Sequence, residues 1–162
     1  MHKAVLLLGG NQGDRHSLLQ RATELIRQRV GAVALSSSVY ETEPWGDFDR
    51  KVANFLNQAL KVETTLSSQE LLQQALDIEK ELGRIRNADR PEADCGKRVY
   101  HSRPIDIDII FYDDECIDTP ALVVPHPRMH QRRFVLDPLC EIIPHYRHPL
   151  LGKTVAELLS EL

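Results

Sequence analysis

The sequence predicts an α+β fold in which helices pack against a largely antiparallel sheet. Three observations lead to this prediction. The strand-like segments are short, two long segments carry apolar residues at helical spacing, and the order is strand, helix, strand, strand, helix, strand. A chain of 162 residues can bury a sizeable core in one unit, so we expect a single domain over residues 1–162.

The predicted elements follow one another along the whole chain. The predicted strands are residues 3–8, 33–40, 55–64, 105–112 and 122–124. The predicted helices are residues 15–30, 67–82, 137–142 and 155–162. This βαββαβ order, with additions at the C-terminal end, resembles the ferredoxin-like α/β sandwich.

Capping residues predict where the two long helices begin and end. Asp14 is a suitable N-cap for the first helix, and Ser67 with Glu70 fits the capping box of the second. Gly31 and Gly83 follow the last apolar residues of these helices, and we expect each glycine to end its helix.

Two segments between the predicted elements have the composition of loops. Residues 42–50 contain Pro, Gly and Asp, and residues 87–102 form a long polar stretch. A loop as long as the second one, inside a compact domain, is usually functional or disordered. We therefore expect residues 87–102 to take part in function.

Composition excludes several classes of partner. The net charge of −4 argues against a nucleic-acid partner, and no apolar run approaches the roughly 18 residues of a membrane helix. The apolar start at residues 3–8 is too short for a signal peptide. Three widely spaced cysteines without a C-x-x-C pair suit the cytoplasm. We expect a cytoplasmic monomer, with His145 and His148 on its surface.

Two carboxylates interrupt the apolar segment SRPIDIDII. On a strand, residues i and i+2 share a face, so Asp106 and Asp108 point one way while Ile105, Ile107 and Ile109 point the other. A half-buried strand with a solvated acidic face fits the pattern as well. Two carboxylates on one face repel each other, however, unless a cation lies between them, and magnesium is usually held by one or two carboxylates plus substrate phosphates.

The sequence also supplies cations for phosphate groups. Six basic residues lie between residues 84 and 103, and three more follow Pro125-His126-Pro127. They are Arg84, Arg86, Arg90, Lys97, Arg98, Arg103, Arg128, Arg132 and Arg133. Any one of them fits a solvated loop, but guanidinium groups match phosphate oxygens, and the set favours a polyphosphate ligand that carries magnesium.

Seven segments together resemble the 6-hydroxymethyl-7,8-dihydropterin pyrophosphokinase family, and the resemblance runs from Leu8 to about Leu159. The segments are LGGNQGD (8–14), YETEPWG (40–46), FLN (55–57), IEKELGRIR (78–86), RPIDID (103–108), PHPRM (125–129) and RRFVL (132–136). Each segment alone is a weak signal, but their order and spacing are specific.

The resemblance implies a reaction and a metal. The family transfers the pyrophosphoryl group of ATP to the hydroxymethyl group of the dihydropterin and releases AMP, in folate biosynthesis. It uses two Mg²⁺ ions between an acid pair and the triphosphate, and Asp106 and Asp108 match that pair. Arg84 and Arg103 match catalytic positions. Asp108 is one candidate for the group that takes the hydroxyl proton.

The resemblance also implies binding residues for the two substrates. The positions that match ATP contacts are Glu79, Arg86, Tyr100, Ile109, His126 and Arg132. The positions that match pterin contacts are Thr42, Pro44, Trp45, Gly46, Phe55, Asn57 and Phe134. Phe55 and Asn57 share one face of a strand, so a ring and an amide would meet a flat heterocycle on one side.

Two other functions fit part of the sequence. A sugar transferase with a D-x-D metal site would explain Asp106 and Asp108, but neither the arginines nor the pairing of Phe55 with Asn57. An RNA-binding module of the same fold would explain the basic loop. The acid pair would repel RNA phosphates, however, and the aromatic pattern of such modules is missing.

Overall fold

The computed structural model describes residues 1–10, 14–42, 55–84 and 105–162, with the side chains of residues 83 and 84 left out. The strands are β1 (His2–Gly10), β2 (Gly31–Ser36), β3 (Tyr40–Thr42), β4 (Phe55–Thr64), β5 (Asp106–Tyr112), β6 (Ile117–Asp118) and β7 (Val123–Val124). The helices are α1 (Arg15–Arg29), α2 (Ser68–Glu79), α4 (Arg133–Ile142) and α5 (Val155–Ser160). A π-helical turn η1 (Lys80–Arg84) follows α2, and a 3-10 turn η2 (Met129–Gln131) precedes α4.

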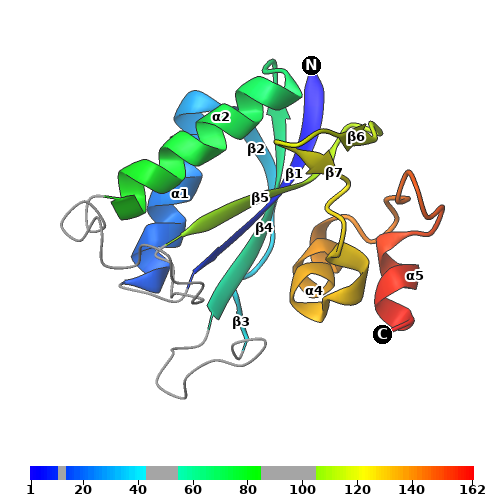
Figure 1. The fold of residues 1–162 in the computed structure, drawn as a ribbon. Helices are drawn as coiled ribbons and strands as arrows, with labels where there is room; N and C mark the ends of the chain where they lie inside the picture. Colours follow the sequence, from blue (N-terminus) through cyan, green and yellow to red (C-terminus); the bar gives the residue numbers. More distant parts are fainter. Residues whose placement is uncertain (11–13, 43–54, 85–104) are drawn as a thin grey trace, which may run out of the picture.

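One antiparallel sheet organises the described chain. Its strand order is β2-β4-β1-β5, and β3 pairs with the far end of β4. Helices α1 and α2 lie on one side of this sheet, whereas α4 and α5 lie on the other (Figure 1). This arrangement confirms the predicted α+β sandwich, but three strands rather than the predicted two lie between α1 and α2.

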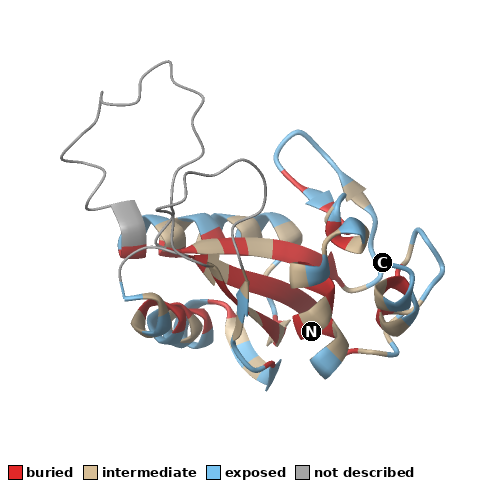
Figure 2. Ribbon diagram, turned by 90° about the horizontal axis from the view of Figure 1, so that it is seen from below, coloured by how far each residue is buried: buried red, intermediate tan, exposed pale blue. Residues whose placement is uncertain are grey.

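The alternation of side chains along β1 divides the core into two layers. Ala4, Leu6 and Leu8 belong to the cluster beneath α1 and α2, and Val5 and Leu7 belong to the cluster beneath α4 and α5. The strands between the helices are the most buried part of the molecule (Figure 2). Every residue of β1 from Ala4 to Leu8 is therefore buried, which explains why the strand lacks polar residues there.

A bulge in β5 changes which way its side chains point. Leu6 pairs with Ile109 and Val5 with Phe111, so Ile110 is the extra residue. Ile110 and Phe111 both lie in the α4 layer, while Ile109 lies in the α2 layer. The bulge lets the first half of the strand present its acidic residues on the α4 side, and the second half fills the core there.

The predicted capping box of α2 is confirmed, but the predicted end at Gly83 is wrong. The Ser67 hydroxyl accepts from the Glu70 N–H (3.1 Å), and the Glu70 carboxylate accepts from the Ser67 N–H (2.9 Å). At the other end the helix continues into the π-helical turn, which runs through Gly83 to Arg84. Single π-helical turns often occur near functional sites, and this one directly follows Glu79.

The prediction that Gly31 caps α1 is also wrong. Asp14 caps the N-terminus as predicted, with its carboxylate accepting from the Ser17 N–H (3.2 Å), but the C-cap is Val30. Gly31 is the first residue of β2, and a Cβ there would lie 1.9 Å from the carbonyl oxygen of Glu63 on β4. The glycine is needed for the close approach of two strands, not for a left-handed turn.

Three further sequence predictions differ from the structure, whereas the predicted loops at residues 43–50 and 87–102 lie outside the described residues. Helix α4 begins at Arg133, four residues before the predicted start at residue 137. The predicted strand over residues 33–40 divides into β2 and β3. His148, predicted to lie on the surface, is 4% exposed, whereas His145 is exposed as predicted.

His148 shapes the loop between α4 and α5. Its Nδ1 accepts from the N–H groups of Leu150 and Leu151 (3.1 and 3.0 Å), and its ring meets Phe111 edge-on at 5.8 Å. Burial, and to a smaller extent the neighbouring His130, lower the pKa of His148. The folded protein therefore holds this imidazole in its neutral form, with the proton on Nε2.

We expect acid to destabilise the wild-type protein more than the His148→Asn variant. Asparagine keeps an acceptor near the place of Nδ1 but does not titrate. The unfolded chain takes up a proton at the ordinary histidine pKa of about 6.5, and the folded chain does so only at a lower pH. The stability that neutral His148 contributes above about pH 6.5 is thus lost as the pH falls toward the folded pKa. Urea unfolding at several pH values measures this, and parallel curves for both proteins would contradict it.

Candidate active site

The acid pair lies on β5, at one edge of the sheet. Asp106 and Asp108 are half-buried, while Ile107 and Ile109 on the opposite face are buried in the α2 layer. Asp106 pairs with Gly9 of β1, and Asp108 pairs with Leu7. The prediction that the two carboxylates share one face is therefore confirmed, and that face is the α4 side.

One row of residues crosses the sheet at the height of Asp106. In order across the strands it comprises Tyr40 on β3, Asn57 on β4, Gly9 on β1 and Asp106 on β5. Residues paired directly across strands point to the same face. Asn57 and Asp106 therefore stand on the same face, two strands apart, which places their backbones about 10 Å from each other.

Gly9 allows Asn57 to lie flat across β1. A Cβ at position 9 would be 2.8 Å from Oδ1 of Asn57 and 3.3 Å from the carbonyl oxygen of Leu56. Any larger residue would push the amide out of its place. Sequence reasoning missed this role for Gly9, although a glycine inside an apolar strand is a known sign of close approach.

The predicted pterin contacts from β3 and β4 lie together beside this row. The Nδ2 group of Asn57 donates to the hydroxyl of Thr42 (3.1 Å), and Asn57 itself is 4% exposed. Thr42 pairs with Phe55, which shares the face of Asn57 because it lies two residues earlier on β4. The amide, the hydroxyl and the aromatic ring thus line one continuous part of the α4 side.

Glu79 closes the outer edge of β5. It is the last residue of α2 and accepts from the N–H of Ile107 (2.6 Å), at an edge where no described strand pairs with β5. Burial raises the pKa of Glu79 to about 8, the hydrogen bond from Ile107 opposes the shift, and Asp106 and Asp108 add to it. Three carboxyl groups therefore lie near one another at the edge of the sheet, and repulsion from Asp106 and Asp108 is part of what raises the pKa of Glu79.

The segment between β7 and α4 brings basic and aromatic groups to the same edge. The N–H of His126 donates to the carbonyl oxygen of Ile110 on β5 (3.1 Å). Burial lowers the pKa of His126, Arg132 and Arg128 lower it further, and Asp106 acts in the opposite direction. The guanidinium of Arg132 lies 5.6 Å from the ring centre of Phe134 in the first turn of α4.

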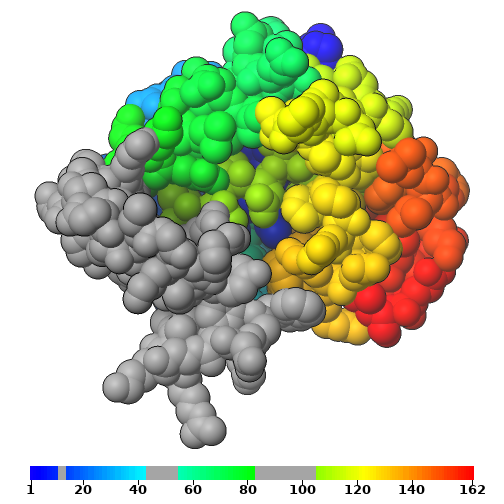
Figure 3. All heavy atoms as spheres, viewed as in Figure 1, coloured from blue at the N-terminus to red at the C-terminus, as the bar shows by residue number. Residues whose placement is uncertain are grey.

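These groups surround a recess in the molecular surface. Figure 3 shows atoms of β5 and β1 recessed between those of α2 and those of the segment that leads to α4. Among the described residues, no group of three or more His, Cys, Asp or Glu side chains has the arrangement of a metal site. Asp106 and Asp108 alone fit the smaller protein contribution that magnesium needs when phosphates supply further ligands.

The structure leaves several predicted site residues outside its described part. Pro44, Trp45, Gly46, Arg86, Tyr100 and Arg103 lie outside it, and only the backbone of Arg84 is described. Ile109 lies in the core beneath α2, 5% exposed, so a contact with adenine would have to come from its backbone. The other predicted residues converge on the α4 side of the sheet and on its β5 edge.

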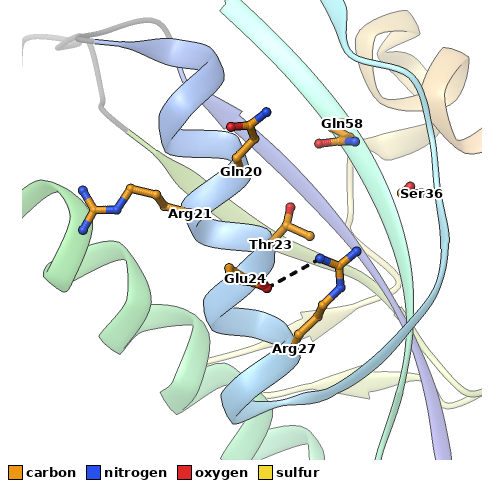
Figure 4. A pocket seen from close by; sticks show the side chains of 7 residues that line it. All are labelled: Gln20, Arg21, Thr23, Glu24, Arg27, Ser36 and Gln58. Carbon is orange, nitrogen blue, oxygen red and sulfur yellow. Dashed lines mark ion pairs between the residues drawn. The ribbon is translucent and has the colours of Figure 1, made fainter.

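A second hollow lies away from the acid pair. It lies between α1 and strands β2 and β4 and has a volume of about 480 Å³ (Figure 4). Its lining is polar, and one ion pair within it joins Arg27 to Glu24 at 3.7 Å. Gln58, which lines this hollow, points to the opposite face of β4 from Asn57 because the two residues are adjacent on the strand.

Comparison with solved structures identifies the fold. The chain is similar to Plasmodium falciparum HPPK-DHPS, with a TM-score of 0.76 at 18% identity. It aligns over 99% of its own length but spans only 43% of that longer chain. A second structure of the Plasmodium falciparum protein, the A437G variant, gives a TM-score of 0.74 at 17% identity. At such low identity the likeness supports the fold alone.

Comparison with curated proteins goes further than the fold. The chain is 43% identical over 145 residues to a 2-amino-4-hydroxy-6-hydroxymethyldihydropteridine pyrophosphokinase of Porphyromonas gingivalis, which covers 89% of this chain and 92% of the relative. It is 39% identical over 161 residues to the enzyme of that name from Aquifex aeolicus, covering 99% and 92%. The Bacillus subtilis enzyme of that name is 44% identical over 140 residues, covering 86% and 77%.

The family model agrees with these relatives. Residues 5–144 match the model of 7,8-dihydro-6-hydroxymethylpterin-pyrophosphokinase (HPPK), and this range includes every predicted site residue. The chain therefore belongs to the HPPK family and is an ATP-dependent pterin pyrophosphokinase of folate biosynthesis.

Proposed function

We propose that the pyrophosphoryl group passes from ATP to the hydroxymethyl group of 6-hydroxymethyl-7,8-dihydropterin on the α4 side of the sheet. The row from Tyr40 to Asp106 carries this proposal, because it sets an amide and a carboxylate on one face, two strands apart. A pterin ring bound at Asn57 would thereby direct its hydroxymethyl group toward β5. Catalysis would then come mainly from positioning and from stabilisation of charge.

Asp106 and Asp108 would hold the magnesium that accompanies ATP, and two ions are expected. The carboxylates share a face, and their charge already contributes to the raised pKa of Glu79, so a cation there is favourable. Bound magnesium would neutralise phosphate oxygens and orient the reacting groups. Glu79 would fix the strand that carries both acids through its bond to Ile107. Asp108 remains a candidate for the group that takes the hydroxyl proton.

The basic residues at the β5 edge of the sheet would bind the phosphates of ATP. Arg132 lies at the start of α4, and His126 is held beside Ile110 by a backbone hydrogen bond. The Nδ1 atom of His126 accepts from the N–H of Arg128 (3.4 Å), so the neutral ring has its proton on Nε2 and can donate. Further contacts are proposed from the end of η1, at Arg84, and from the segment between η1 and β5, at Arg86, Tyr100 and Arg103. Ile109 is proposed to contribute its backbone.

The pterin would lie between two aromatic side chains above Asn57. Phe55 and Phe134 are proposed to stack on its faces, and the Asn57 amide to bond its edge next to Thr42. Phe134 packs against the apolar cluster beneath α4, so its ring is held in place before any ligand arrives. Pro44, Trp45 and Gly46 would complete the pocket from the segment that follows β3.

We further propose that residues 1–162 act as one monomeric domain in the cytoplasm. Two of its thiols, Cys116 and Cys140, are free, which suits a reducing compartment. Within the described residues no helix is long and apolar enough to cross a membrane.

The product of the reaction tests the proposed chemistry most directly. We expect the purified protein to form AMP from ATP only when the dihydropterin alcohol and magnesium are both present, as measured by chromatography of the nucleotides. Removal of magnesium with a chelator, or omission of the pterin, should abolish AMP formation. ADP as the product would contradict pyrophosphoryl transfer.

Neutralising either member of the acid pair should reduce turnover without loss of pterin binding. We expect Asp106→Asn and Asp108→Asn each to lower kcat by about 100-fold or more, since each removes charge from the place where the phosphate charge develops. Pterin affinity, measured by fluorescence without nucleotide, should stay within about twofold because the acids do not line the stacking pocket. Asp118→Asn on β6, an exposed strand aspartate, is the matched control. Near-normal turnover in either variant would indicate that the two acids only form a solvated strand face.

Adding a methyl group at position 9 should weaken pterin binding through Asn57. We expect Gly9→Ala to raise the dissociation constant of the pterin about tenfold, because the new Cβ would lie 2.8 Å from Oδ1 of Asn57. In an Asn57→Ser background the same change should have little further effect, since the clashing atom is gone. Equal effects of Gly9→Ala in both backgrounds would show that the methyl group acts elsewhere.

A further inference from the structure

Strand β3 depends on few neighbours for its place in the sheet. It has three residues, Tyr40–Thr42, and its strand pairing within the described part of the chain is with Asn57, Leu56 and Phe55 of β4. It nevertheless carries Thr42, whose hydroxyl accepts from the Asn57 amide (3.1 Å) in the proposed pterin pocket. Something besides one strand ladder must therefore hold β3 if this part of the pocket is to keep its shape.

Glu141 on α4 supplies four hydrogen-bond contacts to the start of β3. Its two carboxylate oxygens accept from the Ser38 N–H, each at 3.1 Å, and one of them accepts from the Ser38 hydroxyl (3.2 Å). The other accepts from the hydroxyl of Tyr40 (2.8 Å). The neighbouring Ser37 is bonded to Ala59 of β4. The Ser37 N–H donates to the carbonyl oxygen of Ala59 (2.9 Å), and the Ser37 hydroxyl accepts from the N–H of Ala59 (2.9 Å).

The same helix carries the opposite wall of the proposed pocket. Phe134 and Glu141 are seven residues apart on α4, which corresponds to about two turns and places them on one side of the helix. Between them, Val135, Leu136 and Leu139 are buried against the sheet, and α4 packs on both β3 and β4. The position of β3 relative to Glu141 is thus also its position relative to the Phe134 ring.

We propose that Glu141 is a positioning residue for the pterin: its carboxylate ties β3 to α4 and so sets the spacing between the Thr42–Asn57 edge and Phe134. The inference rests on the proposed pterin site. Tyr40 belongs to the row that contains Asn57, Gly9 and Asp106, so the tie acts on the strand at the height where the ring would lie.

The charge state of the tie suits this role. The hydrogen bond from Tyr40, followed by those from Ser38, lowers the pKa of Glu141. The hydrogen bond to Glu141, with burial, raises the pKa of Tyr40 to about 12. At neutral pH the carboxylate is therefore an acceptor and the phenol a donor, so the contact persists over the range in which the enzyme would work.

Kinetics with two substrates separates positioning from general damage to the fold. We expect Glu141→Ala to raise the KM and the dissociation constant for the pterin by about fivefold to tenfold, while the KM for ATP changes less than about twofold. Tyr40→Phe removes one of the hydrogen bonds, so it should shift the pterin values in the same direction by a smaller factor. Glu141→Gln should restore part of the loss, because its amide oxygen still accepts from Ser38.

Amide exchange gives a readout that does not depend on turnover. Without ligand, the amides of residues 38–42 should exchange faster in Glu141→Ala than in the wild type, while those of β1 stay unchanged. Glu24→Ala is the matched control, since Glu24 is an exposed glutamate on α1 that forms an ion pair with Arg27 of the same helix (3.7 Å). It should change neither the pterin constants nor this exchange.

Several outcomes would overturn the inference. An unchanged pterin KM in folded Glu141→Ala would do so, and so would a parallel rise in both KM values. If Glu141→Ala does not fold, Tyr40→Phe and Glu141→Gln decide the question by the same criterion. A wild-type protein that forms no AMP would instead refute the proposed function, so the two failures are distinguishable.

Discussion

The pairing of β1 with β4 on one side and β5 on the other is the constraint on which the site depends. Only this register sets Asn57, Gly9 and Asp106 in one row, although the first and last of them come from strands that are not neighbours. A shift of either strand by one residue would turn its side chains to the α2 layer. The buried residues of β1 prevent such a shift, because alternate residues must fill two different apolar layers. The core therefore fixes the relative position of two polar groups that never touch.

The edge strand β5 needs a partner, and the site supplies it. An unpaired strand edge leaves backbone groups without hydrogen bonds, and here Glu79 and the His126 N–H satisfy Ile107 and Ile110. Both partners are among the residues proposed to contact ATP. The same interactions that close the sheet edge thus bring an acid from α2 and an imidazole from the segment after β7 to either end of β5. In this fold, the same two hydrogen bonds close the sheet edge and position Glu79 and His126 at the candidate site.

Much of this arrangement follows from local sequence patterns, and the rest depends on contacts between distant segments. Alternation alone predicts that Asp106 and Asp108 share a face, as do Phe55 and Asn57, because strand geometry is local. The row that joins Asn57, Gly9 and Asp106 could not be predicted. The register between β1 and β5 depends on pairing between segments some hundred residues apart and on the bulge at Ile110. The prediction that Gly31 ends α1 was wrong because glycine serves both as a helix cap and where strands approach closely.

Two other residues show why side-chain roles were missed. His148 looks like a loop histidine in sequence, yet its ring accepts two backbone N–H groups beneath the loop. Glu141 looks like an exposed helix acid, and it is exposed, but its partners lie about a hundred residues earlier in the chain. Neither pattern has a local signal. Hydrogen bonds that join distant segments become visible only when the fold brings both ends together.

The N-terminus of α4 is locally unfavourable for a helix. It has no side-chain cap and no acid in its first turn, and Arg132 and Arg133 place positive charge at the positive end of the helix dipole. Such an arrangement costs roughly 0.3–1 kcal/mol per charge, and Asp137 offsets little of it at 3.9 Å from Arg133. The buried Val135, Leu136 and Leu139 stabilise the helix in spite of this cost. The positive end of a helix dipole beside guanidinium groups attracts phosphate. The feature that weakens α4 by itself would thus suit the phosphate-binding role proposed for Arg132.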